Sequence, residues 1–134
     1  MDASGKLTLL FVCVENSNRS QMAEAFARIH GGDSVEAYSA GSSPSGVVNP
    51  KAIEAMAELD YDLSAHDSVA LSDIPDIQYD FVATMGCGDA CPIYPGTRYE
   101  DWDLPDPAGQ PIELVRQVRN EIKARVEQLL TTLR

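Results

Sequence analysis

The sequence predicts an α/β fold in which a mostly parallel sheet packs against helices. Short apolar segments alternate along the chain with segments that have helical spacing of apolar residues, and the connections between them are short. The first apolar segment, residues 7–12, is almost continuously hydrophobic, which is typical of a strand buried on both faces of a parallel sheet. With 134 residues, the chain is expected to form a single domain over residues 1–134.

The remaining elements of the N-terminal half follow from composition and from helix-ending residues. Residues 21–30 are rich in Ala, Glu and Met and predict a helix that ends at Gly31 and Gly32. Residues 34–40 predict the second strand. A second helix is expected to begin at Asn49 and Pro50, because Asn is a favoured N-cap and Pro a favoured first helical residue.

The C-terminal half is expected to hold two strands and one long helix. Residues 80–85 predict a third buried strand, and the Gly- and Pro-rich residues 86–96 predict a loop. Residues 99–102 predict a short edge strand. Residues 111–133 predict a long amphipathic helix with one apolar stripe. That stripe consists of Val115, Val118, Ile122, Val126, Leu129 and Leu133.

The composition excludes several classes of protein. The formal net charge is −11, so the chain lacks the basic surface of a nucleic-acid-binding protein. No apolar run approaches the length of a membrane span, and no signal peptide is recognisable, so a cytoplasmic protein is expected. Thirteen acidic residues and one basic residue lie between Ala52 and Asp106. This acidic region is consistent with solubility, with adaptation to high salt, or with docking to a basic partner.

The strongest functional signal lies between the first strand and the first helix. It is a loop in which five residues separate a Cys from an Arg, and a Ser follows the Arg directly. A loop that leads into a helix N-terminus presents free backbone N–H groups and a partial positive charge, which favour a tetrahedral oxyanion. The arginine adds a planar fork that can hold two oxygens. The predicted oxyanion-binding loop consists of Cys13, Val14, Glu15, Asn16, Ser17, Asn18, Arg19 and Ser20.

The same surroundings predict a nucleophilic role for Cys13. A helix N-terminus and a nearby arginine stabilise a thiolate, so Cys13 is expected to attack the central atom of the bound anion. Ser20 can donate its hydroxyl to that thiolate. Asn16 can fix the loop by bonding to the backbone with its side chain.

These residues resemble a known family. The segments 9–13 and 19–25 look like the low-molecular-weight protein tyrosine phosphatase superfamily, and within it they are closer to the arsenate reductases than to the phosphatases. Residues 38–41, 84–85 and 103–109 follow in the order of the family, so the resemblance covers essentially the whole chain. It implies a four-stranded parallel sheet flanked by helices on both faces, and no cofactor.

The resemblance also assigns a role to a late aspartate. On residue type alone, Asp106 and Pro107 form a turn. In the family, the Asp of a late Asp-Pro pair acts as general acid and protonates the leaving oxygen, which implies that role for Asp106. Asp101 and Asp103 are nearby candidates for the same role, although neither precedes a proline. No aromatic residue follows Asp103, and this favours a small inorganic anion such as arsenate over phosphotyrosine.

Two further cysteines are not needed by a phosphatase, but they are needed by an arsenate reductase. The resemblance implies that Cys87 attacks the sulfur of Cys13 and expels arsenite, and that Cys91 then moves the disulfide outward to thioredoxin or another thiol reductant. The order of Cys87 and Cys91 stays open, because described members of the family space these cysteines more widely. A related branch uses a low-molecular-weight thiol such as mycothiol. A protein tyrosine phosphatase and a non-enzymatic redox-sensing module are also compatible with the sequence.

A metal ion is not predicted. Some members of the family bind potassium beneath the loop, and Asn16, Glu24 and Ser39 match three of the expected positions. The acidic residue expected after His66 is not clearly present, because Asp67 is offset from that position. The two histidines of the chain, at positions 30 and 66, have no ligand-like spacing.

Overall fold

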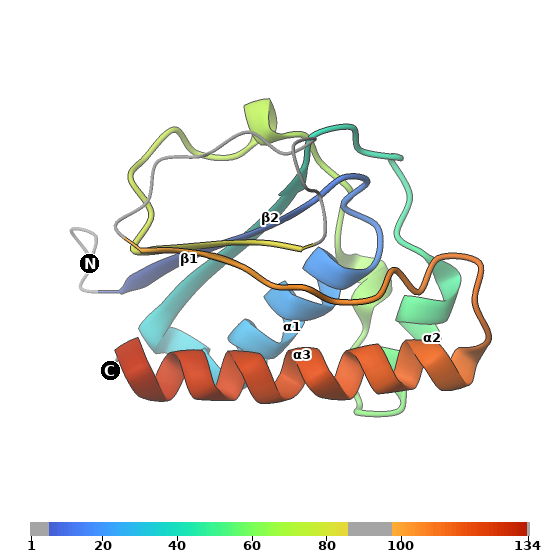
Figure 1. The fold of residues 1–134 in the computed structure, drawn as a ribbon. Helices are drawn as coiled ribbons and strands as arrows, with labels where there is room; N and C mark the ends of the chain where they lie inside the picture. The colour runs from blue at the N-terminus through green and yellow to red at the C-terminus, as the bar shows by residue number, and fades with distance from the viewer. Residues whose placement is uncertain (1–5, 86–97, 134) are drawn as a thin grey trace.

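The computed structural model describes residues 6–85 and 98–133 and has four parallel strands in the order β2-β1-β3-β4 (Figure 1). The predicted α/β class and the four-stranded parallel sheet are therefore confirmed. The last strand lies at the edge of the sheet, as its sequence predicts. The strands are β1 (Leu7–Cys13), β2 (Val35–Gly41), β3 (Phe81–Thr84) and β4 (Tyr99–Asp101).

The first and third α-helices begin and end within two residues of their predicted bounds, and the second begins at Pro50 as predicted. Asn49 caps the second α-helix as expected, because its side chain accepts a hydrogen bond of 2.9 Å from the backbone N–H of Lys51. The α-helices are α1 (Arg19–Gly31), α2 (Pro50–Ala57) and α3 (Ile112–Leu133). Short 3₁₀-helices lie at η1 (Gly32–Ser34), η2 (Leu63–Ala65) and η3 (Leu71–Asp73). No helix in these described ranges is both long and apolar enough to cross a membrane.

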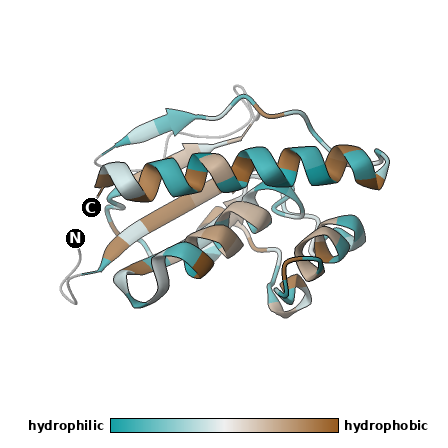
Figure 2. Cartoon of the chain, turned by 90° about the horizontal axis from the view of Figure 1, so that it is seen from below, coloured by the Kyte–Doolittle hydropathy of each residue, from teal (hydrophilic) through white to brown (hydrophobic). Residues whose placement is uncertain are grey.

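The described residues cover the two faces of the sheet differently. Within the described residues, α1, α2 and α3 share one core cluster and lie on one face (Figure 2). The opposite face is covered by residues 69–80, whose helical part is limited to η3. This helix stops at Ile74, which has an extended conformation (φ −95°, ψ 161°) because proline follows it. Among the described residues, the helical cover of the second face is the 3₁₀ turn η3.

Alternation along β1 builds both halves of the core. Leu9 and Phe11 point into the larger cluster with the α-helices, and Leu10 and Val12 point into the smaller cluster beneath residues 69–80. All four side chains are essentially inaccessible to solvent. This explains why residues 7–12 are almost continuously apolar.

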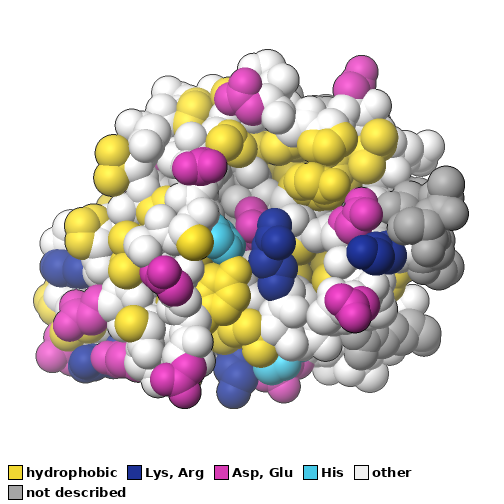
Figure 3. All heavy atoms as spheres, turned by 180° about the vertical axis from the view of Figure 1, so that it is seen from behind, with side chains coloured by type: hydrophobic (Ala, Val, Ile, Leu, Met, Phe, Trp, Pro, Cys, Tyr) yellow, Lys and Arg dark blue, Asp and Glu magenta, His cyan; other side chains and the backbone are white. Residues whose placement is uncertain are grey.

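The surface charge is spread rather than gathered, at least on one side of the molecule. On the face seen from behind, acidic side chains lie scattered among apolar and neutral ones, with Lys and Arg between some of them (Figure 3). This face therefore shows no single acidic patch. A scattered arrangement fits the solubility interpretation of the negative charge better than docking to one basic partner on this face.

The parallel arrangement brings the strand ends to one edge of the sheet. In the register, Cys13 at the end of β1 is opposite Gly41 of β2, and Val12 is opposite Thr84 of β3. Met85 continues this pattern, since its N–H donates to Val12 O at 2.9 Å. Ligands of open α/β sheets bind beyond this edge. The fold thus places the loop that follows Cys13 where a binding site is expected.

Candidate active site

The loop from Cys13 to Ser20 passes from the end of β1 into the N-terminus of α1. Its backbone carbonyls, from Val14 to Asn18, all accept hydrogen bonds from other parts of the chain. The donors are Ser43 N to Val14 O (2.8 Å), Ser45 N to Glu15 O (3.0 Å), Gln21 Nε2 to Asn16 O (2.9 Å), Asn49 N to Ser17 O (2.8 Å) and Met22 N to Asn18 O (3.0 Å). The N–H and C=O of one peptide unit point in opposite directions. The backbone N–H groups of the loop therefore point away from the donors that bind its carbonyls, as in an anion-binding nest.

Close packing of β2 against the loop requires a glycine. A Cβ atom on Gly41 would lie 2.5 Å from Val14 O and 3.0 Å from the backbone N of Asn16. Asn16 itself has a left-handed conformation (φ 50°), which Asn tolerates better than most residues. The shape of the loop thus depends on both residues.

Replacing Gly41 by alanine is expected to lower the free energy of unfolding by about 1–3 kcal/mol, because backbone atoms must move to admit the methyl group. It should also weaken sulfate binding, since the displaced carbonyl belongs to the loop. Chemical denaturation and calorimetry measure the two effects. Gly46→Ala serves as the control, since a Cβ there meets nothing within 4 Å and only its backbone conformation (φ 82°) is strained. If Gly41→Ala binds sulfate as tightly as the unmodified protein does, the close packing of Gly41 against the loop is not required for anion binding.

The sulfur of Cys13 is buried and is held by a short polar network. Cys13 Sγ lies 2.8 Å from Ser20 Oγ, and Asn16 Nδ2 donates to the same oxygen at 2.9 Å. Because Ser20 Oγ already accepts from Asn16, its own proton is available to the sulfur. This is the geometry expected for a hydroxyl that stabilises a thiolate.

The network continues through three residues that were not predicted from the sequence to belong to the site. Gln21, which is fully buried, donates through Nε2 to Asn16 Oδ1 at 3.0 Å. His66 Nδ1 lies 3.0 Å from Gln21 Oε1, and His66 Nε2 is hydrogen-bonded to the hydroxyl of Tyr61. With a neutral His66 that carries its proton on Nδ1, every donor points toward the loop. The chain of bonds then runs from Tyr61 through His66, Gln21, Asn16 and Ser20 to Cys13.

Burial keeps His66 in the neutral form that this network requires. Loss of solvation lowers the pKa of His66, and the nearby carboxylate of Glu24, 3.4 Å from Nδ1, only partly opposes this effect. The unfolded chain therefore binds a proton at a higher pH than the folded protein does. The contribution of His66 to stability must therefore fall as the pH drops below 6.5, the ordinary pKa of histidine.

The His66→Gln variant is expected to lose this part of the pH dependence. Urea denaturation at pH 7.5 and pH 5.5 should show a smaller loss of stability on acidification than in the unmodified protein, because the variant has no buried imidazole to protonate. His30→Gln, which removes a histidine outside this hydrogen-bond network, is the matched control. An identical loss of stability in the unmodified protein and in His66→Gln would show that His66 does not resist protonation.

Arg19 and Asp106 meet above the loop. Arg19 is buried and donates through Nη1 to Leu104 O at 2.9 Å, and its Nη2 lies 4.0 Å from Asp106 Oδ2. Asp106 Oδ1 accepts from Ala108 N at 3.0 Å, so this residue also forms the turn that its type predicts. The side chain of Asp106 is 64% exposed, which leaves its carboxyl free to meet a ligand.

These groups line one cavity of about 350 Å³. Its described lining contains no aromatic side chain. Trp102 is instead buried in the core against Phe11 and Phe81, and Tyr99 lies on β4 with its hydroxyl 3.1 Å from Thr84 Oγ1. The lining residues are Cys13, Val14, Glu15, Ser17, Asn18, Arg19, Asp106 and Ala108. Each of these except Ala108 was predicted from the sequence to belong to the site.

The other predicted residues have different positions. Asn16 and Ser20 lie beneath the cavity and support it, as expected for residues that shape the loop. Asp101, a second candidate for the acid, accepts a hydrogen bond from Thr84 Oγ1 at 2.7 Å and does not line the cavity. Cys87 and Cys91 lie outside the described residues.

Asn18 occupies the N-cap position of α1 but does not cap the helix. Its side chain makes no capping bond, and both amide atoms are buried without a hydrogen-bond partner in the described part of the chain. An unsatisfied buried amide costs about 1–3 kcal/mol.

The residues that match the potassium positions are hydrogen-bonded to other protein groups in this structure. Asn16 Oδ1 accepts from Val69 N at 2.8 Å and from Gln21 Nε2. Glu24 Oε1 accepts from Ser39 Oγ at 2.7 Å, and Glu24 Oε2 accepts from Arg28 Nε at 2.9 Å. These oxygens are thus engaged by protein donors. The mechanism proposed below uses no metal ion.

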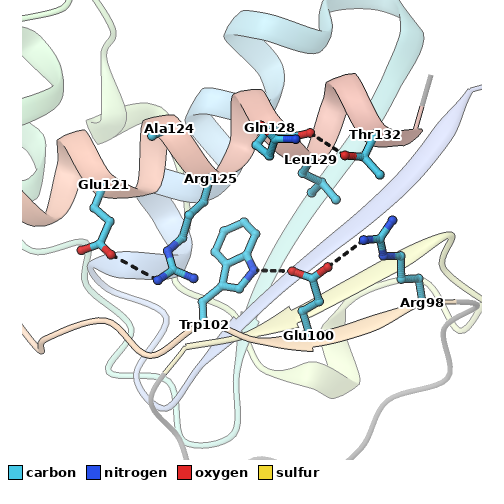
Figure 4. Close-up of a pocket in the computed structure, with 9 residues that line it drawn as sticks. All are labelled: Arg98, Glu100, Trp102, Glu121, Ala124, Arg125, Gln128, Leu129 and Thr132. Carbon is cyan, nitrogen blue, oxygen red and sulfur yellow. Dashed lines mark hydrogen bonds and ion pairs between the residues drawn. The ribbon is translucent and has the colours of Figure 1, made fainter.

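A second cavity, of about 310 Å³, lies between β4 and α3 (Figure 4). Its charged side chains pair with one another, since Arg125 contacts Glu121 at 3.2 Å and Arg98 contacts Glu100 at 3.1 Å. Trp102 Nε1 also donates to Glu100. No charge is left over for a ligand among these pairs, so the cavity beside Cys13 is the better candidate for chemistry.

A cysteine and an arginine at the two ends of a loop between a parallel strand and a helix form the arrangement expected of a protein that binds oxyanions and attacks them with a thiolate. The comparison with family models agrees with this class. Residues 8–134 match the model of the low molecular weight phosphotyrosine protein phosphatases, and the chain belongs to this family.

Several similar proteins within the family are named arsenate reductases. The arsenate reductase of Staphylococcus xylosus is 46% identical over 126 residues, which cover 91% of this chain and 95% of the relative. A solved arsenate reductase in a phosphate-bound state superposes with a TM-score of 0.86 at 38% identity, covering 96% of this chain and 99% of that one. The thioredoxin-dependent arsenate reductase of Corynebacterium glutamicum superposes with a TM-score of 0.79 at 36% identity, covering 98% of this chain and 63% of that one.

Proposed function

We propose that this chain is an arsenate reductase, a thiol-dependent oxidoreductase that converts arsenate to arsenite. The observation that carries the proposal is the small cavity at Cys13, whose described lining holds an arginine and an acid but no aromatic wall for a phenol ring. The similarity to proteins named arsenate reductases supports the same substrate.

In the first proposed step, the thiolate of Cys13 attacks the arsenic atom and a bond from sulfur to arsenic forms. An arsenate oxygen leaves as water after taking a proton from Asp106. Arg19 and the loop amides hold the remaining oxygens and stabilise the negative charge. The long contact between Arg19 and Asp106 supports this division of roles, because it leaves both side chains able to meet the anion.

In the second proposed step, two thiols supply the two electrons that arsenate requires. The sulfur of Cys87 attacks the sulfur of Cys13, the sulfur–arsenic bond breaks, and arsenic leaves with the electron pair as arsenite. Cys91 then attacks Cys87, which frees Cys13 and leaves a disulfide between Cys87 and Cys91. Thioredoxin is the proposed reductant of that disulfide, and the thioredoxin-dependent structural neighbour supports this choice.

Arsenate-dependent oxidation of NADPH by the purified protein, with thioredoxin and thioredoxin reductase, tests the whole cycle. We expect turnover that is lost in Cys91→Ser. Turnover with mycothiol and its reductase but not with thioredoxin would replace the proposed reductant. Hydrolysis of aryl phosphates that survives Cys87→Ser, without arsenate turnover, would identify a phosphatase. A reversible disulfide without either activity would indicate a redox sensor.

A further inference from the structure

The cavity at Cys13 has an unusual balance of charge for an anion-binding site. Its described lining contains one cation, Arg19, and two carboxylates, Glu15 and Asp106. A thiolate at Cys13 adds another negative charge. The attraction for an anion must therefore come from Arg19 and from the loop amides, against the repulsion of the acidic side chains.

Glu15 is the carboxylate that the reaction does not explain. Its backbone is fixed in the loop, because its carbonyl accepts from Ser45 N and from Ser68 Oγ, both at 3.0 Å. Its side chain is exposed and forms no ion pair with the described residues, whereas Asp106 lies 4.0 Å from Arg19. Among the described residues, no ion pair therefore neutralises the charge of Glu15, and Glu15 is one of the residues that line the cavity.

The effect of such a charge depends on the charge of the ligand. Repulsion is proportional to the product of the two charges, so a dianion is penalised twice as strongly as a monoanion. For a solvated carboxylate several ångströms away, the affinity falls about three-fold for a monoanion and about ten-fold for a dianion. Near neutral pH, arsenate exists as a monoanion and a dianion, whereas sulfate is a dianion throughout.

We propose that Glu15 makes the site selective for singly charged tetrahedral oxyanions and against dianions such as sulfate and fully ionised phosphate. This inference rests on the proposed function and deepens it, since it specifies the form in which arsenate binds. A monoanion suits the chemistry, because its oxygens carry protons and leave more easily as water. Glu15 is thus a specificity-determining residue, and it takes no part in bond breaking.

The test compares anion binding by the unmodified protein and by Glu15→Gln, using calorimetry at low ionic strength with reduced protein. We expect the affinity for sulfate at pH 7 to rise about ten-fold in the variant. The affinity for phosphate should rise about three-fold at pH 6, where the monoanion dominates, and about ten-fold at pH 8, where the dianion dominates. Glu54→Gln, an equal charge change at an exposed position of α2, should leave every affinity unchanged.

Equal increases in the affinity of Glu15→Gln for sulfate and for phosphate at pH 6, or no increase for either anion, would overturn the proposal. Glu15→Ala provides a second variant without the carboxylate, and it must give the same pattern. No turnover is needed for these measurements. A protein that binds anions as expected but never reduces arsenate would refute the proposed function and leave this selectivity intact.

Discussion

Replacing Cys13 by serine is expected to lower the rate of arsenate reduction roughly 10⁴-fold or more, as removal of a catalytic nucleophile does in other enzymes. A serine hydroxyl is not ionised at neutral pH and cannot form the bond from sulfur to arsenic. The fold should survive, because Ser is smaller than Cys and the oxygen can still bond with Ser20.

Two readouts separate the loss of chemistry from the loss of structure. Arsenite formation measures the chemistry, and sulfate binding with thermal unfolding measures the integrity of the loop. We expect Cys13→Ser to bind sulfate and unfold cooperatively. Residual arsenate reduction above one hundredth of the original rate would show that another group attacks arsenate.

The Arg19→Lys variant should lose about 10²- to 10³-fold in kcat/KM for arsenate, although the positive charge is retained. The guanidinium of Arg19 holds Leu104 O while its other nitrogen faces Asp106, and a lysine ammonium cannot make both contacts and also bind two oxygens of the anion. The variant should therefore bind sulfate weakly and hold the side chain of Asp106 less firmly in position.

Arg125→Lys is the matched control for this substitution. Arg125 lies in the second cavity, where it pairs with Glu121, and its replacement should leave kcat/KM unchanged. Equal losses in both variants would mean that a general loss of stability, rather than the fork of Arg19, explains the effect. A loss below five-fold in Arg19→Lys would contradict the proposed role in oxyanion binding.

Much of the fold could be predicted because its elements have strong local signals. The apolar run in β1, the Asn-Pro start of α2 and the apolar stripe of α3 each depend on residues close together in the sequence. The segment that covers the face of the sheet opposite the α-helices could not be predicted from such local signals. Residues 69–80 pack through Val69, Leu71 and Ile74 without a helical repeat, so only the tertiary structure shows where they lie.

Part of the candidate site could likewise be predicted from local sequence, and part could not. Cys13, Arg19 and the loop between them are recognisable because one short segment holds both chemistry and spacing. The contribution of His66 could not be recognised from the sequence. Its partner Gln21 is 45 residues away, and a buried histidine has no sequence pattern of its own. The one available signal was the polar Gln21 within a helix whose first turns are buried, since a buried amide must find partners.

The central proposal is that this chain itself supplies both electrons for arsenate reduction, starting with Cys13. A single-turnover experiment tests this most directly: reduced protein is mixed with arsenate in the absence of oxygen and of any added thiol, and both arsenite and free thiols are counted. We predict one arsenite per chain and the loss of two of the three thiols. Arsenite that forms only after an external thiol is added would contradict the proposal.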